Sequence, residues 1–155
     1  MKFIVFLFVM LLPVLGFSQK NYLTYQYNRN NSALEFKYPD YYKIKEADGG
    51  INVIDTAKGK RIPKWTIWPL DPVNGVSIDE TIEIAKTEAG GCEEARDTIR
   101  VAGLPTVRVI LTNTKTKATS ALLLFFEKNQ DVYEIEALKP DLVEVEEFIQ
   151  SLTFQ

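Results

Sequence analysis

The sequence predicts an α+β domain, an α/β/α sandwich around a mostly antiparallel sheet. Segments with strand character fill most of the chain, and only residues 77–89 and 141–152 show the spacing of amphipathic helices. The element order is therefore strands, a helix, four strands and a helix, which is typical of antiparallel α+β domains. One strand within residues 118–138 is apolar on both faces, so we expect helices or long loops to cover both sides of the sheet.

Residues 118–138 are predicted to form a β-hairpin at the centre of that sheet. The first arm contains the apolar run 121–126, and a polar turn cluster at residues 128–131 follows it. The second arm, residues 132–138, alternates between apolar side chains on one face and two glutamates on the other. The apolar face is expected to enter the core, and the glutamates are expected on the opposite face.

Six further segments have the alternation or the apolar content of strands. They are residues 33–38, 42–46, 51–55, 64–70, 94–101 and 105–112. Turn-forming residues at 39–40 and 48–50 separate the first of these strands. The polar segment 20–32 is interpreted either as a leader or as a weak edge strand.

The two predicted helices carry recognisable end signals. Ser77 and Glu80 have the spacing of a capping box at the start of the first helix, and Gly90–Gly91 can end it in the left-handed conformation. Asp141 can cap the second helix, which runs to about Leu152. Each helix has one apolar face, so each is expected to pack against the sheet.

The start of the chain has the pattern of a secretory signal peptide. Lys2 provides a short positive region, residues 3–15 are apolar, and small residues precede a cleavage position after Ser18. The apolar run is shorter than the ~20 residues of a membrane-spanning helix, so we expect cleavage and no stable membrane span afterwards. The protein is therefore predicted to be exported, to a periplasm or to the extracellular space.

The chain is expected to comprise a signal peptide at residues 1–18, a polar leader at residues 19–32 and a single domain at residues 33–155. Its net charge of −3 argues against non-specific binding of nucleic acid. Cys92 is the only cysteine, so no internal disulfide can form. The acidic sequence neighbours of Cys92 favour an inert thiol.

The chain contains no histidine. This removes Ser-His-Asp and Cys-His nucleophilic sites, histidine-ligated zinc and the usual proton shuttle at neutral pH. No phosphate-binding loop, dinucleotide-binding glycine motif or calcium loop is present in the sequence. We therefore expect no cofactor, no bound metal and no familiar catalytic residue set.

A basic loop that leads into a tryptophan is the candidate partner-binding site. It consists of Lys58, Lys60, Arg61, Lys64 and Trp65. Such a loop could dock an acidic partner or an anionic headgroup, with the indole as an anchor. The alternative is a solvated loop beside two tryptophans of the core, Trp65 and Trp68.

Glu134 and Glu136 are the best candidate carboxylate pair. Alternation places both on one face of a strand, about 7 Å apart. Such a pair could act as general acid and base or bind a hard cation. The alternative is a solvated face, or pairing with Arg96, Arg100 or Arg108 of neighbouring strands.

Five short motifs point to a known family. They are Phe36–Ile44, Ser77–Glu80, Val101–Pro105, Tyr133–Ile135 and Phe148–Phe154. In this order they resemble the Mog1/PsbP-like superfamily, which includes small exported bacterial PsbP-related proteins. The family usually ends in Ser-Phe-x-Phe, and Leu152 replaces the first Phe here. The resemblance implies an α/β/α sandwich around an antiparallel sheet and carries over no catalytic residue.

The expected function is that of an exported, non-enzymatic binding or accessory protein of the PsbP-like type. Its partner would be a protein or an envelope component, held by an exposed sheet face or by the basic loop. The alternative is a carboxylate-based hydrolase, or a metal-dependent carbohydrate-active protein, that uses Glu134 and Glu136. A third hypothesis is a carrier with a small-ligand pocket between sheet and helix, which the many large side chains make harder to accommodate.

Overall fold

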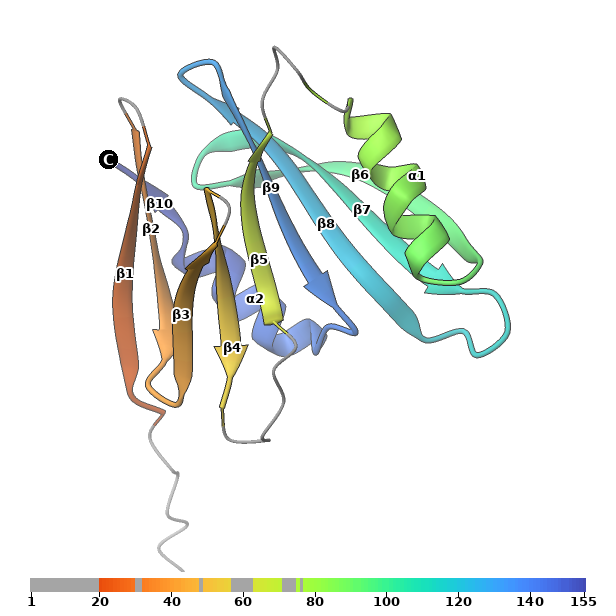
Figure 1. Ribbon diagram of the computed structural model, residues 1–155, viewed down its shortest axis with the longest axis horizontal. Helices are drawn as coiled ribbons and strands as arrows, with labels where there is room; N and C mark the ends of the chain where they lie inside the picture. Colours follow the sequence, from red (N-terminus) through yellow and green to blue (C-terminus); the bar gives the residue numbers. More distant parts are fainter. Residues whose placement is uncertain (1–19, 30–31, 48, 57–62, 71–74, 76) are drawn as a thin grey trace, which may run out of the picture.

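The computed structural model describes residues 20–29, 32–47, 49–56, 63–70, 75 and 77–155. These residues form two helices and the strands of two sheets (Figure 1). In chain order the elements are β1 (Tyr22–Arg29), β2 (Ser32–Pro39), β3 (Tyr42–Ala47), β4 (Gly50–Asp55), β5 (Pro63–Leu70), α1 (Ile78–Glu88), β6 (Cys92–Val101), β7 (Leu104–Asn113), β8 (Thr119–Lys128), β9 (Asp131–Leu138), α2 (Leu142–Ser151) and β10 (Thr153–Phe154).

The larger sheet has seven strands in the order β3-β4-β5-β9-β8-β7-β6, and every pairing in it is antiparallel. β9 is its middle strand and β8 lies beside it, so the predicted central hairpin is confirmed. The run from Ala121 to Phe126 in β8 is buried throughout. Its two apolar faces meet two different layers, as a strand buried on both sides requires.

A smaller sheet, in the order β1-β2-β10, packs against one face of the seven-stranded sheet. β1 pairs with β2 along its whole length, and β10 joins the other edge of β2. Tyr25 and Tyr27 of β1 are half-buried against the core. Of the two interpretations of residues 20–32, the edge strand therefore holds for residues 22–29.

The main core lies between the two sheets and helix α2. Phe36 of β2, Trp65 of β5 and Phe148 of α2 meet there. The rings of Trp65 and Phe148 are stacked, with centroids 4.8 Å apart and planes 8° from parallel. Since burial of large aromatic side chains dominates the energetics of such cores, these rings hold α2 and the small sheet in place.

Helix α1 packs on the opposite face of the seven-stranded sheet, over its β6-β7-β8 half (Figure 1). Ile82 and Ala85 of α1 meet Val109 of β7 and Leu123 of β8 in a second, smaller core. Over β3 and β4 this face carries no described helix or strand (Figure 1). Helix α1 therefore covers only part of this face of the sheet.

The predicted α/β/α sandwich is wrong, because the protein is mostly antiparallel β-structure in two sheets with two short helices in the described residues. The strand predicted at residues 33–38 does not join the central sheet. It pairs with residues 22–29 and with β10 instead, and this small sheet covers the face together with α2. In residues 22–29 tyrosines alternate with polar residues, a pattern that suits a half-buried strand and so allows the pairing with β2.

Both predicted helix starts are confirmed. The Ser77 hydroxyl accepts from the backbone N–H of Glu80, and the Glu80 carboxylate accepts from the backbone N–H of Ser77, which completes the capping box. Asp141 accepts from two backbone N–H groups in the first turn of α2. Gly90 and Gly91 follow α1 with φ of 72° and 84°. These signals fix where α1 ends, and its last turn forms one wall of the groove described below.

No helix in the described part of the chain is both long enough and apolar enough to cross a membrane. Cys92 is the only cysteine, so the chain has no internal disulfide. Its thiol is half-buried at the start of β6, 3.8 Å from the carbonyl oxygen of Ala89. The predicted signal peptide, residues 1–18, lies outside the described ranges.

Candidate functional site

A groove opens where the last turn of α1 meets the start of β5 and the end of β9, and we name it the helix–sheet groove. Its volume is about 690 Å³, within the ~300–1,000 Å³ of typical small-molecule sites. Its lining combines small or apolar residues with charged ones. The lining residues are Asp55, Pro63, Lys64, Ala85, Glu88, Ala89, Ser120, Glu136, Leu138 and Lys139.

Small residues on α1 keep the groove open. Ala85 and Ala89 lie one turn apart at the end of the helix, and neither side chain fills the space above the sheet. On the other side β9 ends at Leu138, which is 43% exposed. Lys139 follows in a left-handed backbone conformation and is exposed. The groove therefore has apolar walls with charged groups at its border.

Glu134 and Glu136 lie on the α1 side of β9, as the alternation predicts. The apolar residues of β9 fill the main core on the other side. In the ladder with β5, Glu134 is opposite Trp68 and Glu136 is opposite Thr66. Glu136 lines the helix–sheet groove directly, and Glu134 is its neighbour on the same face.

Glu136 is held in the groove by a hydroxyl and faces a second carboxylate. Thr66 Oγ1 donates to Glu136 Oε2 at 3.5 Å. Burial raises the pKa of Glu136, the negative charge of Glu88 raises it further, and the Thr66 hydroxyl opposes both effects. Glu88 is exposed and is the last residue of α1. Two carboxylates from different elements thus repel each other in one groove.

Glu134 is a buried carboxylate with only 8% of its surface exposed. Burial, and then the negative charge of Glu136, raise the pKa of Glu134 to about 7. Within the described part of the chain Glu134 has no hydrogen-bond or ion-pair partner. In these residues every fully enclosed side-chain oxygen has a hydrogen-bond partner. Because Glu134 has no such partner, its carboxylate oxygens are not fully enclosed and keep contact with solvent.

The arginines that were considered as partners of the acidic pair are engaged elsewhere. Arg96 Nη1 lies 2.9 Å from a carboxylate oxygen of Asp79, on α1. Arg108 pairs with Asp97 on the neighbouring strand. Arg100 donates to a backbone carbonyl in its own turn. Pairing with these arginines therefore does not account for the two glutamates.

Trp68 adds an aromatic surface next to the acidic pair. It is half-buried on β5, and its ring lies against the backbone of β4 at Gly50. A Cβ at Gly50 would come within 2.5 Å of Trp68 Cε3, so any larger residue would displace the indole. The indole thus covers part of the sheet that no described helix covers.

The predicted basic loop is described only at its end. Lys58, Lys60 and Arg61 lie outside the described residues. Lys64 and Trp65 follow in β5 and are in different surroundings. Lys64 lines the helix–sheet groove, and Trp65 is 4% exposed in the main core.

Lys64 is tied to helix α2 by an ion pair. Its Nζ lies 3.1 Å from Glu144 Oε2, and the hydroxyl of Tyr42 donates to the same oxygen at 3.2 Å. The Lys64 and Glu144 side chains are only 22% and 23% exposed. This contact fixes the start of β5 relative to α2, so Lys64 has a structural partner as well as a place at the groove.

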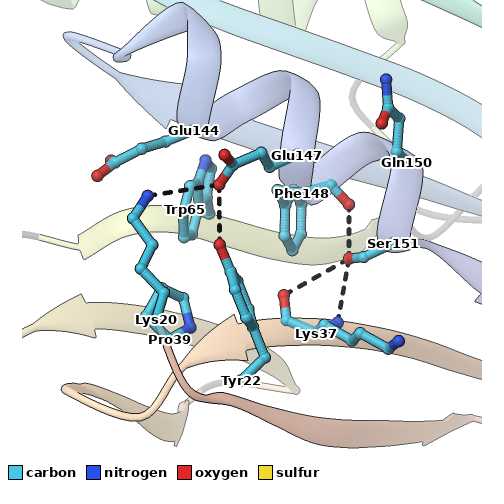
Figure 2. A pocket seen from close by; sticks show the side chains of 10 residues that line it. All are labelled: Lys20, Tyr22, Lys37, Pro39, Trp65, Glu144, Glu147, Phe148, Gln150 and Ser151. Atoms are coloured by element: carbon cyan, nitrogen blue, oxygen red, sulfur yellow. Dashed lines mark hydrogen bonds and ion pairs between the residues drawn. The ribbon is translucent and has the colours of Figure 1, made fainter. Parts of the chain in front are cut away.

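A second and smaller hollow, the hairpin pocket, lies between α2 and the β1–β2 hairpin (Figure 2). Its volume is about 220 Å³, below the usual range for small-molecule sites. Lys20 Nζ and the donating hydroxyl of Tyr22 lie 3.5 and 2.9 Å from one oxygen of Glu147 (Figure 2). The backbone N–H of Lys37 donates to Ser151 Oγ at 3.0 Å. These bonds fasten the hairpin to α2, so we interpret this pocket as a structural joint.

Sequence reasoning did not identify Thr66, Glu88 or Lys139 as neighbours of the acidic pair. The place of Thr66 could have been inferred, because Thr66 follows Trp65 in the strand and so shares the face of the glutamates once β5 pairs with β9. No sequence pattern places Glu88 and Lys139 near the glutamates, because their proximity depends on how α1 crosses the sheet. The groove is therefore a product of the tertiary structure.

No protein-family model matches the chain, and no curated protein is significantly similar to it. A function for this protein therefore has to follow from its own groove, charges and fold.

Proposed function

We propose that this protein is an exported, non-enzymatic binding protein and that the helix–sheet groove is its ligand site. The observation that carries the proposal is the groove itself, a hollow of about 690 Å³ that contains Glu136. Large concave sites with a few convergent polar groups and perturbed carboxylates are typical of ligand binding. The signal-peptide pattern of residues 1–18 supports export.

The composition of the groove favours binding over catalysis. It combines apolar surface with carboxylates on one side and lysines at its border, which is suited to a ligand with both apolar and charged parts. The sequence has no histidine to transfer protons at neutral pH. The uncovered sheet beside the groove, with Trp68 on it, extends the available surface.

A variant that fills the groove tests the proposal. In Ala89→Trp an indole would occupy the groove from a helical backbone position that tolerates it, with φ of −74°. Ile84→Trp is the matched control, because Ile84 is 52% exposed on the same helix and does not line the groove. Each tagged protein is cross-linked in its native extract, and the material that co-purifies is identified by mass spectrometry.

The expected result is one ligand or partner that is captured by the wild type and by Ile84→Trp and lost in Ala89→Trp. Equal capture by all three proteins would place the ligand site outside the groove and contradict the proposal. Trp65→Ala is unsuitable as a surface variant, because Trp65 is only 4% exposed and its loss would disturb the core.

A second candidate function is a carboxylate-based hydrolase. It is favoured by one observation, the pKa of Glu134 of about 7 beside a second carboxylate on the same face. A carboxyl group with such a pKa can donate a proton at neutral pH while a neighbouring carboxylate accepts one. Turnover of a model glycoside or ester, abolished in both Glu134→Gln and Glu136→Gln with the fold retained, would establish it and displace the binding proposal.

A further inference from the structure

We propose that the helix–sheet groove binds a primary alkylammonium group, with Glu136 and Glu88 holding the charge and Glu134 supporting them from the same sheet face. This depends on the groove being the ligand site proposed above. Glu88 and Glu136 both line the groove, and the negative charge of Glu88 raises the pKa of Glu136. No described cation pairs with either of them. An ammonium group between them would relieve this repulsion.

Neither lysine of the groove forms an ion pair with these carboxylates in the described residues. Lys64 lies 3.1 Å from Glu144 Oε2 of helix α2, so its charge is already paired. Lys139 is exposed beyond the end of β9, and it forms no ion pair within the described residues. Glu88 and Glu136 therefore have no cation of the described residues within ion-pair distance.

Glu134 lies beside the groove, on the sheet face that carries Glu136 but outside the groove lining, and it is a second indication of a cationic ligand. It is 92% buried by surface area, since 8% of its surface is exposed, and it has no partner in the described residues. Its oxygens nevertheless keep contact with solvent on the side of the sheet that carries Glu136. A carboxylate that is withdrawn from water and left without a partner is costly, and a ligand cation would offset that cost.

The chemistry of the groove fits an alkylammonium better than a metal ion. The described residues contain no group of three Asp, Glu or Cys side chains arranged to hold a metal. An ammonium brings three N–H donors of its own, which two carboxylates can accept. Pro63, Ala85 and Leu138 provide apolar surface in the same groove, where the alkyl chain of such a ligand would lie.

Isothermal titration of the purified protein with cadaverine (1,5-diaminopentane) at pH 7.5 and low salt tests the proposal. We expect saturable binding that weakens about tenfold or more in Glu136→Gln, because a charge-assisted hydrogen bond is lost. Glu127→Gln is the matched control, since Glu127 is an exposed carboxylate on β8 outside the groove. It should keep the wild-type affinity, and 1-pentanol, which lacks the charge, should not bind.

Absence of saturable binding, or an equal loss in Glu136→Gln and Glu127→Gln, would overturn the proposal. Nα-acetyl-lysine methylamide then distinguishes the source of the ammonium. Tighter binding than cadaverine supports a lysine side chain of a partner, and weaker binding supports a free amine. If Ala89→Trp abolishes capture from extracts but cadaverine does not bind, the groove remains the ligand site and the ammonium assignment fails. Cadaverine binding that Ala89→Trp leaves unchanged would place the cation elsewhere.

Discussion

The hydroxyl groups of Tyr133 and Ser32 form a buried 2.8 Å hydrogen bond that joins the two sheets. Tyr133 is fully buried on β9, the middle strand of the large sheet, and Ser32 begins β2 of the small sheet. The Ser32 hydroxyl also lies 3.3 Å from the carbonyl oxygen of Arg29. The pair therefore provides a polar link within an otherwise aromatic interface.

Ser32→Ala should destabilise the protein more than Tyr133→Phe. The alanine variant leaves the buried Tyr133 hydroxyl without this partner, which costs about 1–3 kcal/mol. The phenylalanine variant leaves Ser32 its contact with Arg29, so a loss of about 0.5–1.5 kcal/mol is expected. Urea denaturation of both variants and of the double variant gives the coupling between the residues. If the losses of stability in the two single variants add up to the loss in the double variant, the hydrogen bond does not stabilise the contact between the sheets.

Gly50→Ala should destabilise the uncovered side of the sheet. The new Cβ would lie 2.5 Å from Trp68 Cε3 and 2.7 Å from the backbone oxygen of Ile67. The indole can move but the backbone cannot, so we expect a loss of about 1–3 kcal/mol and a change in Trp68 fluorescence. Urea denaturation followed by fluorescence measures both. Unchanged stability and emission would show that Trp68 does not lie over Gly50.

Trp65→Ala should be among the most damaging substitutions in the chain. The Trp65 ring stacks on Phe148 at 4.8 Å and is 4% exposed, so its removal opens a cavity between β5 and α2. Truncation of a buried tryptophan costs about 3–5 kcal/mol. Thermal unfolding by circular dichroism checks this, and Trp65→Phe should recover part of the loss. A variant with wild-type stability would favour the earlier interpretation of Trp65 as a surface anchor.

The central hairpin and both helices could be predicted from the sequence because their signals are local. The apolar run of β8 and the alternation of β9 indicate burial within a few residues. Ser77 with Glu80, and Asp141, set the helix starts through bonds to backbone groups in the next turn. None of these features requires knowledge of the remaining fold.

The second sheet could not be predicted, because its pairings are not local. β10 is only two residues long and pairs with β2 from the far end of the chain. Nothing in its sequence distinguishes it from a frayed helix end. The sheet face on which Glu134 and Glu136 lie was predicted correctly. The proximity of Glu88 to Glu136 could not be predicted, because it depends on the position of α1.

Glu134→Gln should stabilise the protein at high pH and leave it unchanged at low pH. Below its ordinary pKa of 4.5 the Glu134 carboxyl is protonated in both the folded and the unfolded protein. Between pH 4.5 and about 7 the unfolded chain releases this proton while the folded protein keeps it. The free energy of unfolding of the wild type therefore falls as the pH rises through this range, by up to ~3 kcal/mol from this group.

A neutral glutamine of the same shape does not carry this cost, so the stability difference between Glu134→Gln and the wild type should grow from pH 4 to pH 8. Urea denaturation across this range measures it. Glu127→Gln is the control, since its carboxylate is exposed on β8 and should show no comparable trend. The pKa of Glu136, on the same face, is also raised. Glu136→Gln should therefore also reduce the pH dependence of the free energy of unfolding. A constant difference across the range would show that Glu134 titrates alike in the folded and the unfolded protein, so that burial does not raise its pKa.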